Sequence, residues 1–193
     1  MSGTFLIVGL GNPGPQYTQT RHNAGFWFLD VLLKDAGMSL RPQSRLSAEI
    51  GRANLYGFDC VLARPTTFMN HSGQAVRAVM DYYKIPVSHL LVAYDELDLP
   101  VGTSRLKRGG GHGGHNGMRD IFRHLSDREF MRLRIGIGHP GFKEAVTGYV
   151  LGRAPAEQEQ QIMYSIGDAV AVMPDVLAGE LPKATKQLHT KKA

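Results

Sequence analysis

The sequence predicts an α/β protein of a single domain, built on a mixed, mostly parallel twisted sheet with helices on both faces. Short apolar runs alternate along the chain with apolar residues at helical spacing, which is the pattern of strands connected by helices. One pair of runs flanks a tight turn and indicates a hairpin. The 193 residues contain no repeat and no long linker. We therefore expect one domain over residues 1–193, with a basic C-terminal tail at about 183–193.

The expected elements follow from these two periodicities in chain order. Short apolar runs predict the strands, and apolar positions three and four residues apart predict the helices. In the N-terminal half we expect strands at 5–8, 48–55 and 58–63, the last two joined at Tyr56-Gly57, and helices at 26–36 and 75–83. In the C-terminal half we expect strands at 90–94, 101–107 and 133–138, and helices at 118–125 and 155–173.

Composition limits the class of protein. The single cysteine, Cys60, excludes an intramolecular disulfide and a cysteine-rich zinc site, and it favours a reducing compartment. The apolar run at the N-terminus is too short for a signal peptide. No run approaches the roughly 18 apolar residues of a membrane span. We therefore expect a cytoplasmic protein that binds no membrane.

The positive charge is concentrated in one segment. The chain carries a formal net charge of +5, and between Ser104 and Arg134 eight basic residues stand against three acidic ones. Clustered positive charge suits a polyanion such as nucleic acid. On charge alone, a basic face that contacts only water remains an equal alternative.

Three polar clusters follow predicted strands. Residues 9–22 follow the first strand, residues 65–70 follow the hairpin, and Asp95 comes directly after the strand at 90–94. In open α/β sheets, ligands bind outside the carboxyl ends of the strands. If these strands are parallel, the three clusters meet at one edge of the sheet.

His22 and Asp95 are the candidate catalytic pair. A histidine at the start of a helix is by itself more often a cap or a packed surface group. Asp95 changes this interpretation, because a carboxylate at the end of an apolar strand needs a partner. A carboxylate that is hydrogen bonded to a histidine fixes its tautomer and raises its basicity, so the pair is suited to activate water.

No protein nucleophile is evident, which favours direct attack by water. The chain lacks the G-x-S-x-G pattern, and Cys60 lies in an apolar strand where a core role is expected. Water attack requires a donor for the developing oxyanion, and asparagine amides can serve. The candidates are Asn12, Asn70 and Asn116. Each also has a structural alternative, since Asn12 and Asn70 suit turns and Asn116 is placed to cap the helix at 118–125.

Two glycine-rich segments need separate interpretations. Residues 9–14 match the dinucleotide pattern G-x-G-x-x-G, but Pro13 and Pro15 fix the local backbone and no helix begins there, so we interpret a tight loop that presents Asn12. Residues 109–117 contain six glycines and suit a mobile loop or one that approaches a ligand closely. The histidines within it do not complete a zinc pattern, so we expect no metal and no cofactor.

Taken together, the motifs resemble those of the bacterial-type peptidyl-tRNA hydrolase family. The matching stretches run in order from residue 8 to residue 140, and the resemblance covers nearly the whole chain. They are VGLGNPGPQYTQTRHNAG, RPTTFMNHSG, VAYDELDLPVG, GGGHGGHNG and RLRIGIGHP. The resemblance implies hydrolysis of the ester that joins a peptide to the terminal ribose of tRNA, with His22 and Asp95 activating water.

The resemblance also implies roles for the remaining site residues. The family's asparagines match Asn12, Asn70 and Asn116, of which Asn12 is expected to act in catalysis and the other two in substrate binding. Further substrate-binding positions are Tyr17, Phe68, Met69 and His115. Basic residues that hold the tRNA 5′ phosphate match Lys107 and Arg134, with Arg105 nearby as a further candidate, and all three fall within the basic segment.

Two alternatives differ in function class. A non-catalytic RNA-binding protein of the same fold would explain the charge but not the joint presence of Asn12, His22 and Asp95. A nicotinamide oxidoreductase would explain only residues 9–14. We expect tRNA as the partner and no obligate protein partner. We also expect a monomer, because no heptad pattern is present.

Overall fold

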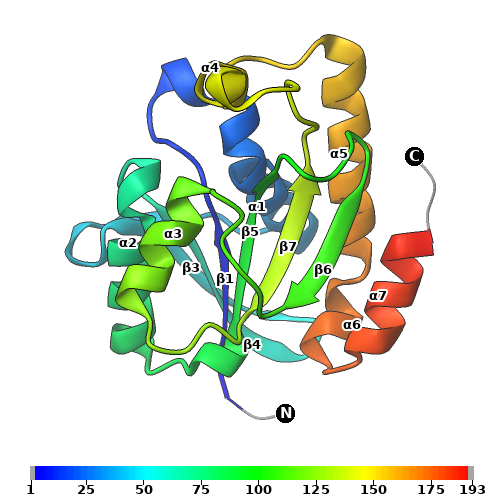
Figure 1. Cartoon of the computed structure of the whole chain (residues 1–193). Helices are drawn as coiled ribbons and strands as arrows, with labels where there is room; N and C mark the ends of the chain where they lie inside the picture. The colour runs from blue at the N-terminus through cyan, green and yellow to red at the C-terminus, as the bar shows by residue number, and fades with distance from the viewer. Residues whose placement is uncertain (1–2, 191–193) are drawn as a thin grey trace.

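The sheet is mixed and has seven strands in the order β2-β3-β4-β1-β5-β7-β6 (Figure 1). The computed structural model describes residues 3–190. The four central strands β4, β1, β5 and β7 run parallel, while β2, β3 and β6 are antiparallel to their neighbours. The predicted fold class is therefore confirmed. The strands are β1 Phe5–Gly9, β2 Arg41–Gln43, β3 Ala48–Leu55, β4 Phe58–Pro65, β5 Leu90–Glu96, β6 Ser104–Arg108 and β7 Met131–Gly136.

Helices cover both faces of the sheet. One face packs against α1 and α5, and the other packs against α2 and α3, while α4 lies across the end where the parallel strands finish (Figure 1). Two 3-10 turns, η2 at Arg21–Asn23 and η4 at Met69–His71, lead into α1 and α2. The helices are α1 Ala24–Ala36, α2 Ser72–Tyr83, α3 Asn116–His124, α4 Val146–Val150, α5 Ala156–Ala171, α6 Met173–Leu177 and α7 Leu181–Thr190.

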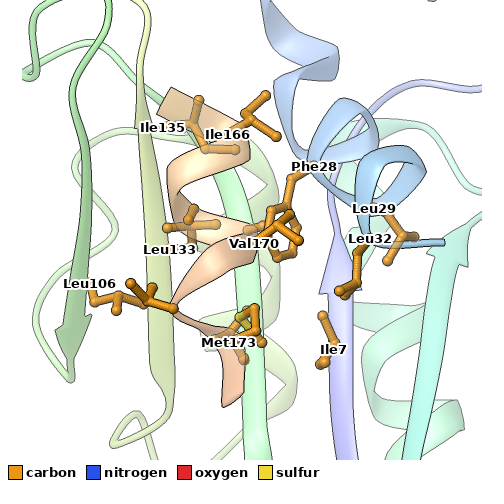
Figure 2. Close-up of a cluster of buried hydrophobic side chains, with 14 of the residues drawn as sticks. Ile7, Phe28, Leu29, Leu32, Leu106, Leu133, Ile135, Ile166, Val170 and Met173 are labelled. Carbon is orange, nitrogen blue, oxygen red and sulfur yellow. The ribbon is translucent and has the colours of Figure 1, made fainter. Parts of the chain in front are cut away.

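The larger core lies between the sheet and the helices α1 and α5 (Figure 2). Phe28 and Leu32 of α1, Ile166 of α5, and Leu133 and Ile135 of β7 are all fully buried in this core. Because side chains alternate along a strand, β7 directs its arginines at 132 and 134 to the opposite face. The apolar face of β7 thus anchors the helices, and its other face presents positive charge.

The hairpin between β3 and β4 forms as predicted. Tyr56 and Gly57 both have positive φ, at 54° and 90°, as a two-residue turn between twisted strands requires. The C-terminal elements differ more from expectation. The strand predicted at 133–138 spans residues 131–136, that predicted at 101–107 begins only at Ser104, and the predicted last helix divides at Val172 into α5 and α6.

The glycines at 9–14 serve close packing and not a dinucleotide. A Cβ on Gly9 would lie 2.2 Å from the carbonyl oxygen of Gly25, and a Cβ on Gly25 would lie 2.4 Å from the carbonyl oxygen of Ala93. The segment after β1 continues into short 3-10 turns, and α1 begins only at Ala24. Residues 9–14 therefore do not lead directly into a helix, as they do in a dinucleotide-binding turn. The close contacts bring the start of α1 against the carboxyl ends of β1 and β5.

The basic residues predicted as a C-terminal tail lie partly in α7, which packs against α6 and β6 (Figure 1). The Nε2 of His189 accepts a hydrogen bond of 3.0 Å from the backbone N–H of Leu106 on the edge strand β6. Residues 191–193 of that tail lie outside the described residues. Within residues 3–190, none of the helices has the length and apolarity needed to cross a membrane.

Candidate active site

A cleft of about 250 Å³ opens where the parallel strands end. It receives side chains from the loop after β1, from η2 and η4, from the end of β5, from the glycine-rich loop before α3, and from α4. The three polar clusters recognised in the sequence therefore converge, as parallel strands require. Seven of the predicted site residues line this cleft: Asn12, His22, Met69, Asn70, Asp95, His115 and Asn116.

His22 and Asp95 form a direct hydrogen bond. The Nδ1 of His22 lies 2.9 Å from the Oδ2 of Asp95, and the side chains are only 10% and 1% exposed. η2 presents His22 and the end of β5 presents Asp95, two segments 73 positions apart in sequence. With Nδ1 directed at the carboxylate, the Nε2 of His22 has no hydrogen-bond partner among residues 3–190. That nitrogen is available to take a proton from a molecule in the cleft.

The second oxygen of Asp95 is held by His115. The Nε2 of His115 lies 2.8 Å from Oδ1, so the two oxygens of one buried carboxylate each contact a different histidine. The Nδ1 of His115 accepts from the backbone N–H groups of Gly117 and Met118 at 3.1 and 3.3 Å. Because Nδ1 is an acceptor in these bonds, Nε2 carries the proton that is donated to Asp95.

His115 also corrects the predicted helix cap. We expected Asn116 to cap the helix that follows, but the N-cap of α3 is His115, whose ring accepts from the first turn of the helix. Asn116 is the first residue of α3, and its Oδ1 accepts from the Nη1 of Arg119 at 3.0 Å. The prediction was wrong because a ring nitrogen can replace the short side-chain oxygen that usually caps a helix.

His22 and Asp95 each stabilise the charged form of the other. Burial by itself lowers the pKa of His22, but the charge of Asp95 and the hydrogen bond to it outweigh burial and raise the pKa above its ordinary value of 6.5. Burial by itself raises the pKa of Asp95, but the two histidines outweigh burial and hold the pKa well below its usual range. Asp95 is therefore ionised at neutral pH and stabilises a positive charge on His22.

The same three residues are the group with metal-ligand geometry within residues 3–190. One nitrogen of His22, one nitrogen of His115 and a carboxylate oxygen of Asp95 all lie within 4.8 Å of one another. His22 and His115 each also hydrogen bond to Asp95 through one ring nitrogen. A metal ion bound through those nitrogens would have to replace both hydrogen bonds.

Asn12 is oriented with its amide nitrogen free. The backbone N–H of Met69 donates to the Oδ1 of Asn12 at 2.7 Å, which distinguishes the oxygen from the nitrogen of this side chain. The Nδ2 of Asn12 makes no hydrogen bond to any described residue. Asn12 is 7% exposed and lines the cleft with His22. Its N–H groups are therefore placed to donate to an oxyanion formed beside the imidazole.

The other substrate-binding candidates lie at or outside the rim. Asn70 and Asn116 are exposed and line the cleft. Tyr17 and Phe68 do not line it. They contact each other edge to face, with ring centroids 6.2 Å apart, and Phe68 is 54% exposed. The structure thus separates these two aromatic rings from the seven residues it gathers in the cleft.

The phosphate-binding candidates lie together on the sheet face away from α5. In the register of β6 and β7, Arg105 is directly opposite Arg134, and Lys107 is directly opposite Arg132. Like charges directly opposite each other destabilise a sheet unless an anion offsets them. The Nε of Arg134 donates to the Oε1 of Glu96 at 2.9 Å, while Arg105 and Lys107 are exposed. This arrangement suits a phosphate group.

Sequence reasoning missed several residues that line the cleft. Glu96 is buried beside Asp95 and connects the cleft to the basic face through Arg134. The sequence alone did not distinguish the role of Glu96 from that of its neighbour Asp95. The cleft is also lined by Leu97, by α4 and by the residue that follows α4. Those α4-side residues are Val146, Thr147, Val150 and Leu151.

The fold and this geometry define an α/β protein with a buried, hydrogen-bonded histidine–carboxylate pair in a cleft at the carboxyl edge of its sheet. Comparison with known proteins gives the family. The family model described as peptidyl-tRNA hydrolase matches residues 6–193, and the chain belongs to this family. Peptidyl-tRNA hydrolase of Pseudomonas savastanoi is 51% identical, with 100% of both chains covered.

Further relatives agree along nearly the whole chain. Peptidyl-tRNA hydrolase of Halorhodospira halophila is 50% identical over 184 residues, covering 95% of each chain. The crystal structure of peptidyl-tRNA hydrolase from Acinetobacter baumannii superposes with a TM-score of 0.95 at 47% identity, covering 98% of this chain and 96% of that chain. The resemblance inferred from the motifs is therefore confirmed.

Proposed function

We propose that this chain hydrolyses the ester bond between the C-terminus of a peptide and the 3′-terminal ribose of tRNA, recycling tRNA from peptidyl-tRNA that ribosomes release. The observation that carries the proposal is the hydrogen-bonded pair His22–Asp95 beside the free amide of Asn12, in a member of the peptidyl-tRNA hydrolase family. The named activity of the relatives supports the same reaction.

In this reaction a water molecule between His22 and the ester carbonyl is the nucleophile. The Nε2 of His22 takes a proton from the water as its oxygen bonds to the carbonyl carbon. Asp95 stabilises the imidazolium, and the Nδ2 of Asn12 donates to the oxyanion. The tetrahedral intermediate then collapses, the bond to the ribose oxygen breaks, and the imidazolium returns its proton to that oxygen. The peptide leaves as a carboxylic acid, which loses its proton to solvent at neutral pH.

The cleft supplies both polar and apolar contacts for the acyl group. Asn70 and Asn116 line the cleft and are proposed to hydrogen bond with the peptide backbone, and Met69 and Val150 provide apolar surface. His115 also lines the cleft, but its two ring nitrogens are already used by Asp95 and by the first turn of α3. Tyr17 and Phe68 lie outside the cleft, where a nucleoside or a longer peptide would contact them.

The basic face next to the cleft is proposed to hold a phosphate of the tRNA. Arg105, Lys107 and Arg134 share this face, and Glu96 connects Arg134 to the cleft. A phosphate there would offset the repulsion between the cross-strand cations. Binding through this face fixes the distance between the tRNA stem and the ester, so it contributes to choosing tRNA over a free peptide ester.

The protein is further proposed to act in the cytoplasm as a monomer, with tRNA as its partner. The single cysteine and the use of a translation product as substrate support this location. Sedimentation equilibrium at micromolar concentration tests the monomer, since a mass of twice 21.2 kDa would contradict it.

Hydrolysis of N-acetyl-aminoacyl-tRNA in the presence and absence of EDTA tests the proposed function. We expect release of the N-acetyl amino acid at the same rate in both conditions. Binding without turnover would favour the non-catalytic RNA-binding alternative. Activity that EDTA abolishes and Zn²⁺ restores would instead place a metal on His22, Asp95 and His115, the group whose ligand atoms lie within 4.8 Å.

A further inference from the structure

We propose that Asn23 is a positioning residue for catalysis, which holds the backbone of Asn12 so that the amide of Asn12 faces the reacting carbonyl. The proposal rests on the proposed function, because it assigns Asn23 a role through the oxyanion donor. Asn23 does not line the cleft and does not contact the catalytic pair by any hydrogen bond within the described residues.

Both polar groups of the Asn23 side chain are used on a single residue. The backbone N–H of Asn12 donates to the Oδ1 of Asn23 at 2.8 Å, and the Nδ2 of Asn23 donates to the carbonyl oxygen of Asn12 at 3.0 Å. Asn23 is only 1% exposed. A buried side-chain amide thus pairs with the backbone donor and acceptor of one residue as a neighbouring strand would, and it replaces strand pairing just beyond the end of β1.

These bonds leave Asn12 with one unused group. Its backbone N–H and C=O are taken by Asn23, and its Oδ1 is taken by the backbone N–H of Met69. Only Nδ2 remains to donate. Three fixed hydrogen bonds therefore determine both the place of the residue and the direction of its amide, and two of the three depend on Asn23.

Asn23 also connects the oxyanion donor to the base. It directly follows His22 in the turn η2, whose residues are all buried. The same short turn therefore carries the imidazole and holds the segment that carries the amide. A displacement of Asn12 by about 1 Å relative to His22 is sufficient to lower the rate of the chemical step, because the donor must meet the oxyanion at hydrogen-bond distance.

A double-mutant cycle between Asn23→Ala and Asn12→Ala tests the proposal. We expect each single variant to lower kcat by at least about tenfold with KM for N-acetyl-aminoacyl-tRNA nearly unchanged, and Asn23→Ala to lower kcat less than about twofold further when Asn12 is already alanine. Equal factors in both backgrounds would overturn the proposal, as would an unchanged kcat in Asn23→Ala. Ser165→Ala is the control, because Ser165 is equally buried and hydrogen bonded but lies on α5, so it is expected to keep kcat.

Asn23→Asp serves if the alanine variant does not fold. Aspartate keeps an acceptor for the N–H of Asn12 but loses the donor to its carbonyl, so kcat is expected to fall while KM is retained. Wild-type kcat in this variant would overturn the proposal. Failure of the proposed function is a separate result, since wild-type protein would then leave N-acetyl-aminoacyl-tRNA intact.

Discussion

One oxygen of the Asp95 carboxylate is hydrogen bonded to His22 at 2.9 Å, and the other is hydrogen bonded to His115 at 2.8 Å. Because the carboxylate is buried and both oxygens are used, Asp95 cannot rotate without breaking one of the two hydrogen bonds. The orientation of the His22 ring is thereby tied to the N-terminus of α3, where His115 is the cap.

Asp95→Asn is expected to move the acidic limb of the pH–rate profile to lower pH. The charge of Asp95 raises the pKa of His22, whereas burial lowers it, so removing the charge leaves burial dominant. The base then stays neutral to lower pH, but it is weaker, and kcat is expected to fall by about 10²–10⁴-fold. The measurement is kcat/KM between pH 5 and 8. An acidic limb that stays in place would show that His22 is not the group that titrates.

His115→Asn is expected to separate capping from support of Asp95. Asparagine is a good N-cap, so α3 should remain stable, but its side chain is too short to replace the bond to Asp95. We expect a lower kcat with a Tm close to that of the wild type. His115→Ala should lose both functions and lower the free energy of unfolding by about 1 kcal/mol or more. Equal kcat in wild type and His115→Asn would contradict the supporting role.

Lys107→Ala is expected to raise KM and to flatten its salt dependence. Each phosphate contact that is lost reduces the slope of log affinity against log salt concentration by roughly 0.7–0.9. The measurement is tRNA affinity between about 50 and 200 mM salt, a range over which affinity that depends on phosphate contacts falls steeply. Arg52→Ala is the control, since Arg52 lies on β3 and pairs with Asp59. An unchanged slope in Lys107→Ala would exclude this residue from phosphate binding.

Phe28→Ala is expected to destabilise the fold, and this prediction does not depend on the proposed catalytic roles. The ring is fully buried between α1, α5 and the sheet (Figure 2). Removing it should lower the free energy of unfolding by about 3–5 kcal/mol, because the lost burial and the cavity both contribute. Urea denaturation measures this change. Tyr82→Ala, at a position 57% exposed on α2, should stay within roughly 0.5 kcal/mol of wild type.

The sequence predicts the sheet core and most of the cleft because both depend on local patterns. Apolar runs locate β1 and β5, and the rule that parallel strands end at one edge brings Asn12, His22 and Asp95 together. The start of β7 is less predictable, since Arg132 and Arg134 interrupt its apolar run while its other face is fully apolar. Strands are predicted from runs of apolar side chains, and charged residues on one face of a strand interrupt such a run.

Specific side-chain hydrogen bonds could not be predicted from apolar patterns. The capping role of His115 is local, but it depends on the direction of a ring nitrogen. The two hydrogen bonds between Asn23 and Asn12 depend on two loops that meet only in the folded chain. The wall from α4 has no polar motif to mark it, so Val146 and Val150 look like ordinary helix residues. The position of Glu96 between Asp95 and Arg134 likewise appears only when β5 and β7 are paired.

The most direct test of the account is single-turnover hydrolysis of N-acetyl-aminoacyl-tRNA by His22→Ala at saturating enzyme. We expect the cleavage rate to fall by at least about 10²–10⁴-fold while the affinity for tRNA is retained, because we propose that the imidazole takes the proton from water and the basic face binds the phosphate. Cleavage near the wild-type rate by this variant would contradict the assignment of His22 as the base.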